Sequence, residues 1–230
     1  MRYYLQPMMA LPQAYSLIGI LGIKLNISTG ERGFTMPDGV TVKWTIGIPS
    51  VPARRILRMR VLELIEEQIE GYDDIEVLVL EDNRKRDLGP KRQAIIDIAQ
   101  GEYINFIDDD DIIADNYIEA LYPLLDGVDC VGFTGQISIE QGPWQNVFYS
   151  KNNGWDNEPN GYYRPTQHLT PVKTELVRQI PYTGHNHEDH EWATRMKQAD
   201  LLKTENVTPE VLYYYYATSK FNRVGVWVDG

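Results

Sequence analysis

Apolar runs alternate with amphipathic stretches between residues 42 and 125. Residues 42–50, 75–83 and 102–111 each form a short apolar run of the kind that predicts a strand. Stretches with apolar residues at helical spacing follow each run, at residues 53–69, 89–101 and 115–125. This β-α-β-α-β-α order predicts a parallel sheet with right-handed crossover connections.

Individual residues predict how these helices begin, end and pack. In residues 53–69 the predicted buried face consists of Ile56, Val61, Leu64, Ile65 and Ile69. Pro90 suits the first turn of the second helix, and Gly101 suits its C-cap. Asp115 is a candidate N-cap for the third helix.

The second half of the chain has shorter runs and predicts a mixed arrangement. Residues 129–135, 136–141 and 144–150 predict short strands, and residues 151–165 predict a loop rich in aromatic residues and turn formers. Those aromatic side chains suit stacking on sugars, or they fix the loop to the protein. Thr170 and Pro171 predict a helix start, residues 188–200 a further helix and residues 207–218 a late strand.

The first 40 residues differ from the rest in their turn-rich character, which predicts a boundary near residue 41. We expect residues 1–41 to be an N-terminal elaboration packed on a main domain at residues 42–230. Residues 14–25 are apolar but too short to span a membrane, so they predict a packed strand or hairpin. We expect no signal peptide and no membrane span.

Composition is typical of a soluble globular protein and disfavours nucleic acid as a partner. The 230 residues are 43% hydrophobic and 24% charged, with a net charge of −11. That sign is wrong for a broad phosphate-binding face. The single cysteine, Cys130, excludes an internal disulfide and has an apolar setting that predicts burial. These features together predict a cytoplasmic protein.

Polar residues follow all three predicted parallel strands, as "IPS" (48–50), "LEDN" (80–83) and "DDDD" (108–111). Ligands of open α/β sheets bind beyond the carboxyl ends of the strands. The sequence therefore predicts a binding site at this edge.

The aspartates at 108–111 call for a compensating charge or for water. In an extended segment Asp108 and Asp110 project to one side, and Asp109 and Asp111 to the other. Two carboxylates about 7 Å apart at an effective dielectric of about 20 repel by roughly 2 kcal/mol. Either water solvates an acidic turn or a divalent cation binds the oxygens; an EF-hand is excluded because Ile113 replaces its glycine.

A second metal motif is weaker. The stretch "HNHEDH" places His185, His187, Asp189 and His190 at the spacing of zinc-binding metallo-β-lactamase-like hydrolases. That fold needs further ligands downstream, and no histidine follows His190 in the sequence. The hydrolase interpretation is disfavoured.

The order of motifs resembles the family 2-like glycosyltransferases of the GT-A fold. The matching stretches are "TIGIPS", "VLVLEDN", "GPKRQAIIDIAQGEYINFIDDDD", "TPVKTELVRQI", "EDHEWATRM" and "PEVLYYYY", in order between residues 43 and 216. The resemblance implies a Rossmann-like α/β domain whose mostly parallel central sheet is flanked by helices, with a mixed second half.

The resemblance also implies a metal-dependent, inverting transfer of a sugar from a nucleoside-diphosphate donor, expected to be a UDP-sugar, to the hydroxyl of a glycan or other acceptor. Asp108 and Asp110 match the Asp-x-Asp positions that hold Mn²⁺ or Mg²⁺, and Asp108 with Asp109 matches donor-binding positions. Pro49 and Ser50 match the strand end that lines the base pocket. By the same resemblance Asp82 meets the base and Arg92 holds the nucleotide.

Asp189 matches the catalytic base of the family, with Glu188 beside it. A helix N-terminus would keep Asp189 ionised. The structural alternative is that these acids only cap the helix while Glu191 and Arg195 form an i,i+4 pair. His187 is a candidate further metal ligand.

Two other functions stay open at this point. One is a non-catalytic module of the same fold that binds sugar nucleotides or glycans. The other is a glycosyltransferase that modifies nucleobases of DNA or RNA, which the net charge disfavours. The basic segment 84–92 within an acidic chain supports anion binding or is a solvated loop.

Overall fold

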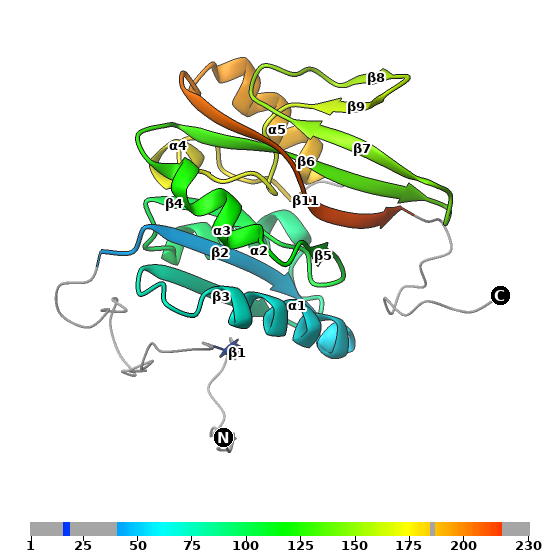
Figure 1. The fold of residues 1–230 in the computed structure, drawn as a ribbon. Coiled ribbons are helices and arrows are strands. Elements are labelled where there is room, and N and C mark those ends of the chain that lie inside the picture. Colours follow the sequence, from blue (N-terminus) through cyan, green and yellow to red (C-terminus); the bar gives the residue numbers. More distant parts are fainter. Residues whose placement is uncertain (1–15, 19–40, 185–186, 218–230) are drawn as a thin grey trace.

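The computed structural model describes residues 16–18, 41–184 and 187–217, and their strands join into one mixed sheet (Figure 1). The strands are β1 Ser16–Ile18, β2 Trp44–Ser50, β3 Ile75–Glu81, β4 Tyr103–Phe106, β5 Ile112–Ile113, β6 Cys130–Ile139, β7 Trp144–Tyr149, β8 Asp156–Glu158, β9 Gly161–Arg164, β10 Val172–Lys173 and β11 Glu205–Ala217. The helices are η1 Pro52–Arg54, α1 Arg55–Gln68, α2 Leu88–Ile98, α3 Tyr117–Leu121, η2 Tyr122–Leu125, α4 Thr174–Val177 and α5 Glu188–Ala199.

The first half of the sheet is parallel, as predicted. β2 pairs in parallel with β3 on one side and with β4 on the other. In this register Ser50, the last residue of β2, lies beside Glu81, the last residue of β3. The carboxyl ends of the three strands therefore meet at one edge.

The second half is mixed. β10 runs antiparallel to both β4 and β6, and β11 runs parallel to β6 while pairing antiparallel with β5. The runs at 129–135 and 136–141 were predicted as separate strands but belong to β6, a single strand of ten residues. Likewise the predicted loop at 151–165 contains the β8–β9 hairpin.

Only a small part of the predicted N-terminal elaboration falls within the described residues. Ser16–Ile18 pair antiparallel with β3 at the edge of the sheet. Residues 1–15 and 19–40 lie outside the described part, so the boundary near residue 41 stays a prediction. In residues 41–184 and 187–217 no helix has both the length and the apolar character needed to cross a lipid bilayer.

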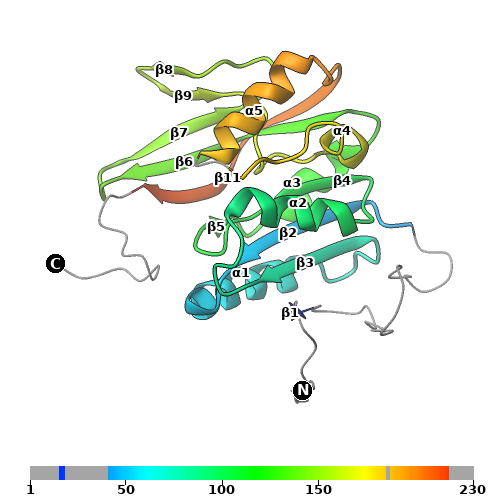
Figure 2. The same cartoon turned by 180° about the vertical axis from the view of Figure 1, so that it is seen from behind.

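Helices cover both faces of the sheet (Figures 1 and 2). One buried cluster joins β2 and β3 with α1 and α3, through residues such as Trp44, Ile65 and Tyr117. The other lies on the opposite face and joins α2, α4 and α5, through residues such as Ile95 and Trp192. The short helices α1, α2 and α5 are thus held by tertiary packing rather than by their own propensity.

The inward face of α1 differs from its prediction at its first turns. Val61 and Ile65 are buried as expected, but Ile56 is 72% exposed. The buried residue one turn before Val61 is Arg58, which is 3% exposed. A charged side chain is buried there because α1 starts beside the polar edge of the sheet, where Arg58 finds carboxylate and hydroxyl partners.

Three other boundary predictions are wrong. α2 ends at Ile98, and Gly101 is required instead by close packing, since a Cβ there would lie 2.5 Å from the backbone nitrogen of Thr45. The N-cap of α3 is Asn116 rather than Asp115. The helix expected from Thr170 starts at Thr174, because residues 172–173 pair as strand β10.

Candidate active site

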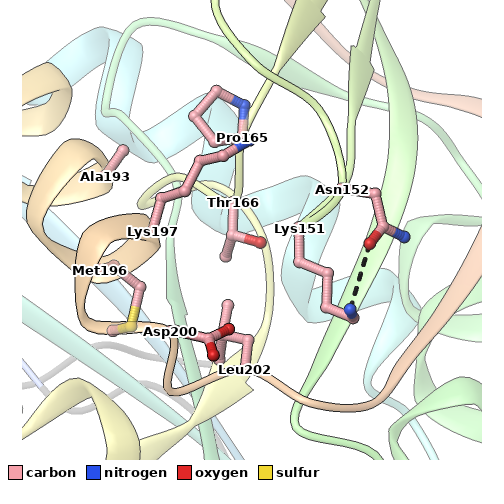
Figure 3. Close-up of a pocket in the computed structure, with 9 residues that line it drawn as sticks. All are labelled: Lys151, Asn152, Pro165, Thr166, Ala193, Met196, Lys197, Asp200 and Leu202. Atoms are coloured by element: carbon pink, nitrogen blue, oxygen red, sulfur yellow. Dashed lines mark hydrogen bonds between the residues drawn. The ribbon is translucent and has the colours of Figure 1, made fainter.

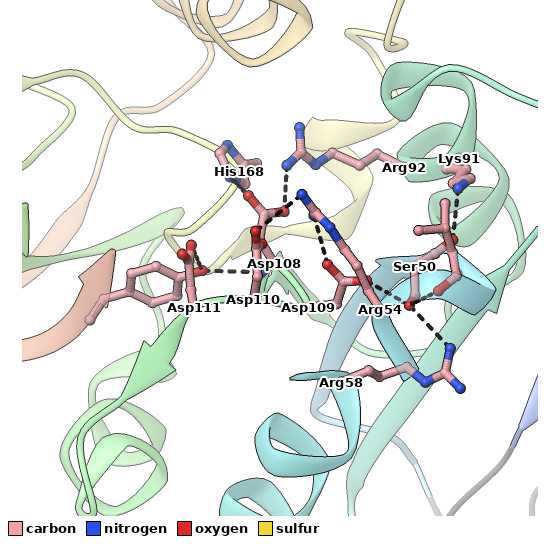
Figure 4. Close-up of polar contacts among 12 residues, drawn as sticks. Ser50, Arg54, Arg58, Lys91, Arg92, Asp108, Asp109, Asp110, Asp111 and His168 are labelled. Carbon is pink, nitrogen blue, oxygen red and sulfur yellow. Dashed lines mark hydrogen bonds and ion pairs between the residues drawn. The ribbon is translucent and has the colours of Figure 1, made fainter. Parts of the chain in front are cut away.

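Charged and polar side chains connect the ends of β2 and β3 with the acidic run after β4, and Arg92 connects that run to the start of α5. Figure 4 shows the contacts around Asp108, Asp109, Asp110 and Asp111. The members of this network come from segments that the topology brings to one edge of the sheet. Sequence analysis predicted this meeting of strand ends, and the structure confirms the spatial arrangement.

Ser50 connects β2 to the acidic run. Its hydroxyl donates a 2.6 Å hydrogen bond to Asp109, whose side chain is almost fully buried. Arg58 in turn donates to the Ser50 hydroxyl at 3.1 Å and pairs with Glu81 at the end of β3. Ser50 therefore lies between a guanidinium donor and a carboxylate acceptor, which fixes its rotamer.

Arg54 holds two aspartates together. Its guanidinium lies 3.0 Å from an oxygen of Asp109 and 3.1 Å from an oxygen of Asp110. The predicted alternation of these side chains along an extended strand is wrong, because β4 ends at Phe106 and the run forms a turn closed by a 3.3 Å bond from Asp111 N to Asp108 O.

The acid predicted to meet the nucleotide base is already paired within the protein. Asp82, 8% exposed, forms a 2.9 Å ion pair with the ammonium of Lys91, and Arg86 lies 3.7 Å away. Lys91 also donates a 2.7 Å hydrogen bond to the carbonyl of Ser50. Part of the basic segment 84–92 thus neutralises an acid at the strand ends.

Arg92 occupies the centre of the network. It is 1% exposed, lies 2.8 Å from Asp108 and pairs on its other side with Glu188, the first residue of α5. Burial alone would lower the pKa of Arg92, but the carboxylates of Asp108 and Glu188 raise it. Its guanidinium is permanently charged and engaged by two carboxylates.

Two residues that sequence analysis did not select also contact the run. His168 is buried, with Nε2 3.5 Å from a carboxylate oxygen of Asp108. The hydroxyl of Tyr213 donates a 2.8 Å hydrogen bond to Asp111 and accepts one of 3.1 Å from the backbone of Asp108. No local motif surrounds His168. Arg54 and Arg58 lie four residues apart just after a predicted strand end, and this spacing could have indicated that they belong to the site.

The four aspartates differ in protonation because their partners differ. Burial would raise the pKa of Asp108, but Arg92 and His168 hold it well below its usual range. Burial together with the charges of Asp108 and Asp109 raises the pKa of Asp110 to about 6, although Arg54 opposes this. Burial and the neighbouring carboxylates raise the pKa of Asp111 well above its usual value.

The carboxylate oxygens of the acidic run are suitable ligands for a hard divalent cation, but they do not form a complete coordination shell. Within the described residues no group of three or more His, Cys, Asp or Glu side chains is placed to hold a metal ion. Mn²⁺ and Mg²⁺ often take only one or two protein carboxylates and complete their coordination with water and phosphate oxygens. Asp108 and Asp110 are carboxylates of this kind, and burial, together with the charges of Asp108 and Asp109, raises the pKa of Asp110.

The start of α5 carries the predicted base. Asp189 is half-buried in the first turn, directly after the buried Glu188. His187 is exposed at the N-cap with φ 62°, and within the described residues its ring forms no hydrogen bond or ion pair with Asp108 or Asp110. Arg195 and Glu191 form the expected i,i+4 pair, with an N···O distance of 2.9 Å.

Aromatic residues of the 151–165 segment are packed against the protein itself. Trp155 stacks on His190 of α5 with ring centroids 4.0 Å apart, and the guanidinium of Arg164 lies 5.6 Å from its ring centroid. Of the two interpretations left open for this segment, these contacts support the one in which the aromatics fix it in place.

A separate cavity of about 170 Å³ lies along α5, away from the acidic run (Figure 3). It is lined by Lys151, Asn152, Pro165, Thr166, Ala193, Met196, Lys197, Asp200 and Leu202. Both lysines are engaged by nearby oxygens, those of Asn152 and Asn153. Nothing in its lining belongs to the network above.

Comparison with known proteins identifies the family. The family described as Glycosyl transferase family 2 matches residues 59–197, which is more than half of the chain. No curated protein gives a significant match.

Solved structures agree in fold. Residues 1–349 of S. aureus TarS in complex with UDP-GlcNAc superpose with a TM-score of 0.57 at 14% identity, covering 81% of this chain and 62% of that chain. The same TarS fragment with UDP gives a TM-score of 0.51 at 14% identity, with coverages of 78% and 62%. A mannosyltransferase, PcManGT from Pyrobaculum calidifontis in complex with GDP-Man and Mn²⁺, scores 0.49 at 14% identity, with coverages of 78% and 60%.

At these identities the likeness to solved structures concerns the fold, and this chain spans less than two thirds of the TarS fragment. The resemblance stated from the motifs is confirmed, and so is the predicted α/β fold class. The chain belongs to glycosyl transferase family 2 and has the GT-A fold of its glycosyltransferases.

Proposed function

We propose that this chain transfers a sugar from a nucleoside-diphosphate donor to an acceptor hydroxyl, with inversion and with a divalent cation. The observation that carries the proposal is the meeting of four elements at one edge of the sheet. Ser50 and Arg54 hold Asp109 and Asp110, while Arg92 pairs with both Asp108 and Glu188. These two sets of contacts meet at the neighbouring residues Asp108 and Asp109, although their other members are far apart in sequence. A fold alone does not give this convergence of side chains.

The donor side of the site comprises the ends of β2, β3 and β4. Pro49 and Ser50 would line the base pocket, and Asp82 would offer a carboxylate to the base while Lys91 neutralises its charge. Asp108 and Asp109 would face the ribose and diphosphate. The TarS structures hold UDP-GlcNAc and UDP, which supports a uridine nucleotide as the first donor to test.

Asp108 and Asp110 would hold Mn²⁺ or Mg²⁺, with His187 kept as a candidate further ligand. When bound, the cation neutralises the negative charge that develops on a leaving diphosphate. Arg54 bridges Asp109 and Asp110, so a cationic group already lies against this part of the run, which supports its preference for positive charge.

Asp189 would act as the general base. The acceptor oxygen forms a bond to the anomeric carbon, its proton goes to Asp189, and the electron pair of the breaking bond leaves with the nucleoside diphosphate. The N-terminus of α5 favours the ionised carboxylate that can take the proton. Glu188 is buried in its pair with Arg92 and is less available to an acceptor.

The test is a screen of UDP-glucose, UDP-GlcNAc, UDP-galactose and GDP-mannose for thermal stabilisation, with Mn²⁺ and with EDTA. A ligand at about 100 times its Kd stabilises the folded state by about 2.7 kcal/mol, which is readily detected. We expect one donor to raise the Tm only with Mn²⁺, and the Asp110→Asn variant to lose this effect. Stabilisation by no donor under either condition would contradict the proposal.

Turnover separates an enzyme from a binding module of the same fold. Release of UDP or GDP from the stabilising donor, with water or an added glycan as acceptor, should require Mn²⁺ and Asp189. A donor that binds but gives no product with any acceptor, and no slow hydrolysis, would favour the binding module.

A further inference from the structure

Arg92 makes a contact that none of the roles above requires. Its guanidinium lies between Asp108, after β4, and Glu188, at the start of α5, and only 1% of the residue is exposed. Figure 4 shows the contact with Asp108. A buried arginine with two carboxylates on different elements joins those elements, because its planar fork binds both at once.

The surroundings show that α2 and the start of α5 are built to stay together. At Gly89, one turn before Arg92, a Cβ would lie 2.0 Å from the carbonyl oxygen of Thr183 and 3.2 Å from the Cβ of Glu188. Gln93 accepts a 2.9 Å hydrogen bond from the backbone of Tyr182. The α2 helix therefore contacts both the segment that leads into α5 and the first residue of α5.

Packing under Arg92 leaves its guanidinium little freedom. The rings of Phe106 and Tyr182 lie 5.8 Å and 6.0 Å from it. Tyr182 is itself stacked on Trp192 of α5, with ring centroids 5.1 Å apart and an interplanar angle of 2°. Arg92 is thus enclosed by residues of β4, of α5 and of the segment before α5.

We propose that Arg92 is a positioning residue that couples the acidic run to the catalytic helix, rather than a ligand of the donor diphosphate. By holding Asp108 and Glu188 together, it fixes the first turn of α5, and with it Asp189, relative to the donor side. Glu188 is then the anchor of α5 and not a second base. The kinetic consequence of this inference rests on the proposed function. Its structural consequence, the fixed position of the first turn of α5, does not.

Charge and geometry can be separated by three variants. Arg92→Lys keeps the positive charge beside Asp108 but lacks the fork that binds two carboxylates. Arg92→Gln removes the charge as well. Glu188→Gln weakens the connection to α5 and leaves Arg92 on Asp108. Arg195→Gln is the matched control, since Arg195 on the same helix pairs with Glu191 and with the carbonyl of Pro181.

The structural readout is amide hydrogen exchange of the metal-free protein. Local openings of a few residues change exchange without global unfolding. We expect Arg92→Lys and Glu188→Gln to speed exchange in residues 188–192 by about tenfold or more. Arg195→Gln should leave residues 108–111 at the wild-type rate. Wild-type exchange at 188–192 in both Arg92→Lys and Glu188→Gln would overturn the inference.

The second readout is the Kd of Mn²⁺, measured by electron paramagnetic resonance. Arg92 is a positive charge next to Asp108, so Arg92→Gln should bind Mn²⁺ about five- to tenfold more tightly than wild type. Arg92→Lys should stay within about threefold, and Glu188→Gln should bind no more tightly than wild type. A general loss of folding would weaken Mn²⁺ binding in all three variants. Weaker binding in all three would therefore overturn the interpretation that Arg92 acts as a positive charge beside Asp108.

Kinetics with the donor found by the screen complete the test. We expect Arg92→Lys to lower kcat at least about tenfold while the KM for the donor and the Kd of UDP stay near wild type. A role in binding the diphosphate would instead weaken UDP, and an unchanged kcat would exclude positioning. If wild-type protein neither binds UDP with Mn²⁺ nor turns over, the proposed function fails, and hydrogen exchange still decides whether Arg92 couples the two segments.

Discussion

The hydroxyl of Ser50 donates a 2.6 Å hydrogen bond to the carboxylate of Asp109. Ser50 ends β2 and Asp109 follows the parallel strand β4, and both are almost fully buried, at 3% and 2% exposure. The bond connects the end of β2 to the acidic run, so the shape of the run depends on a residue almost 60 positions earlier.

Replacing Ser50 with alanine should therefore destabilise the protein. A buried carboxylate that loses a hydrogen-bond donor costs about 1–3 kcal/mol. We expect the free energy of unfolding to fall by this amount in urea titrations. Ser138→Ala is the control, because Ser138 donates to a neutral carbonyl, that of Gly142. A loss at Ser50 no larger than at Ser138 would show that Asp109 does not depend on this donor.

Asp110→Asn should stabilise the metal-free protein at neutral pH. The folded-state pKa of Asp110 is raised to about 6 from an ordinary 3.8, so its charge opposes folding. The stabilisation from its protonated form is complete below about pH 3.8 and is lost as pH rises through about 6. A shift of about two units, reduced for solvent screening, corresponds to roughly 1–2 kcal/mol.

The measurement is the Tm of wild type and Asp110→Asn between pH 4 and pH 8 in EDTA. The Tm of the variant should exceed that of wild type by about 3–6 °C at pH 8, and the difference should shrink toward pH 4. Asp126→Asn is the control because Asp126 is 79% exposed. A difference that grows as pH falls would contradict the assigned direction.

Asp189→Asn should abolish transfer and spare donor binding. A general base contributes about 10²–10⁴-fold to the rate, so kcat should fall at least 100-fold, while UDP affinity in Mn²⁺ changes little. Asp200→Asn is the control variant at the other end of α5, where Asp200 pairs with Lys203 on the surface. Normal turnover by Asp189→Asn would remove this residue from the mechanism.

Lys91→Met should be strongly destabilising because it leaves Asp82 buried without its closest partner. Breaking a buried pair costs about 3–5 kcal/mol, and Arg86 at 3.7 Å would offset part of this. Adding Asp82→Asn should recover much of the loss, measured as free energies of unfolding in urea. If the double variant is no more stable than Lys91→Met, the ion pair does not explain the effect.

The parallel core was predictable because its apolar runs and helical patterns are local. β2, β3, α1, α2 and β4 all appear where the apolar runs placed them, within a few residues. The edge at which polar residues gather followed from the direction of parallel strands. These inferences need no knowledge of which side chains touch.

The partners of the site residues were not predictable, because they depend on contacts between distant segments. Sequence analysis assigned Arg92 to the nucleotide, yet two carboxylates, one of them 96 positions away, surround it. Arg58 was missed because it occupies a helix position where an aliphatic residue was expected. His168 lies between two short strands in a segment without any distinctive spacing.

The central claim, that the acidic run gathers a cation for a nucleoside diphosphate, is tested most directly by calorimetric titration of UDP into the wild-type protein and Asp110→Asn. The account predicts that wild type binds UDP at least roughly tenfold more tightly in Mn²⁺ than in EDTA, and that the variant shows no such difference. Equal UDP affinity with and without Mn²⁺ in wild type, or an undiminished metal effect in Asp110→Asn, would contradict it.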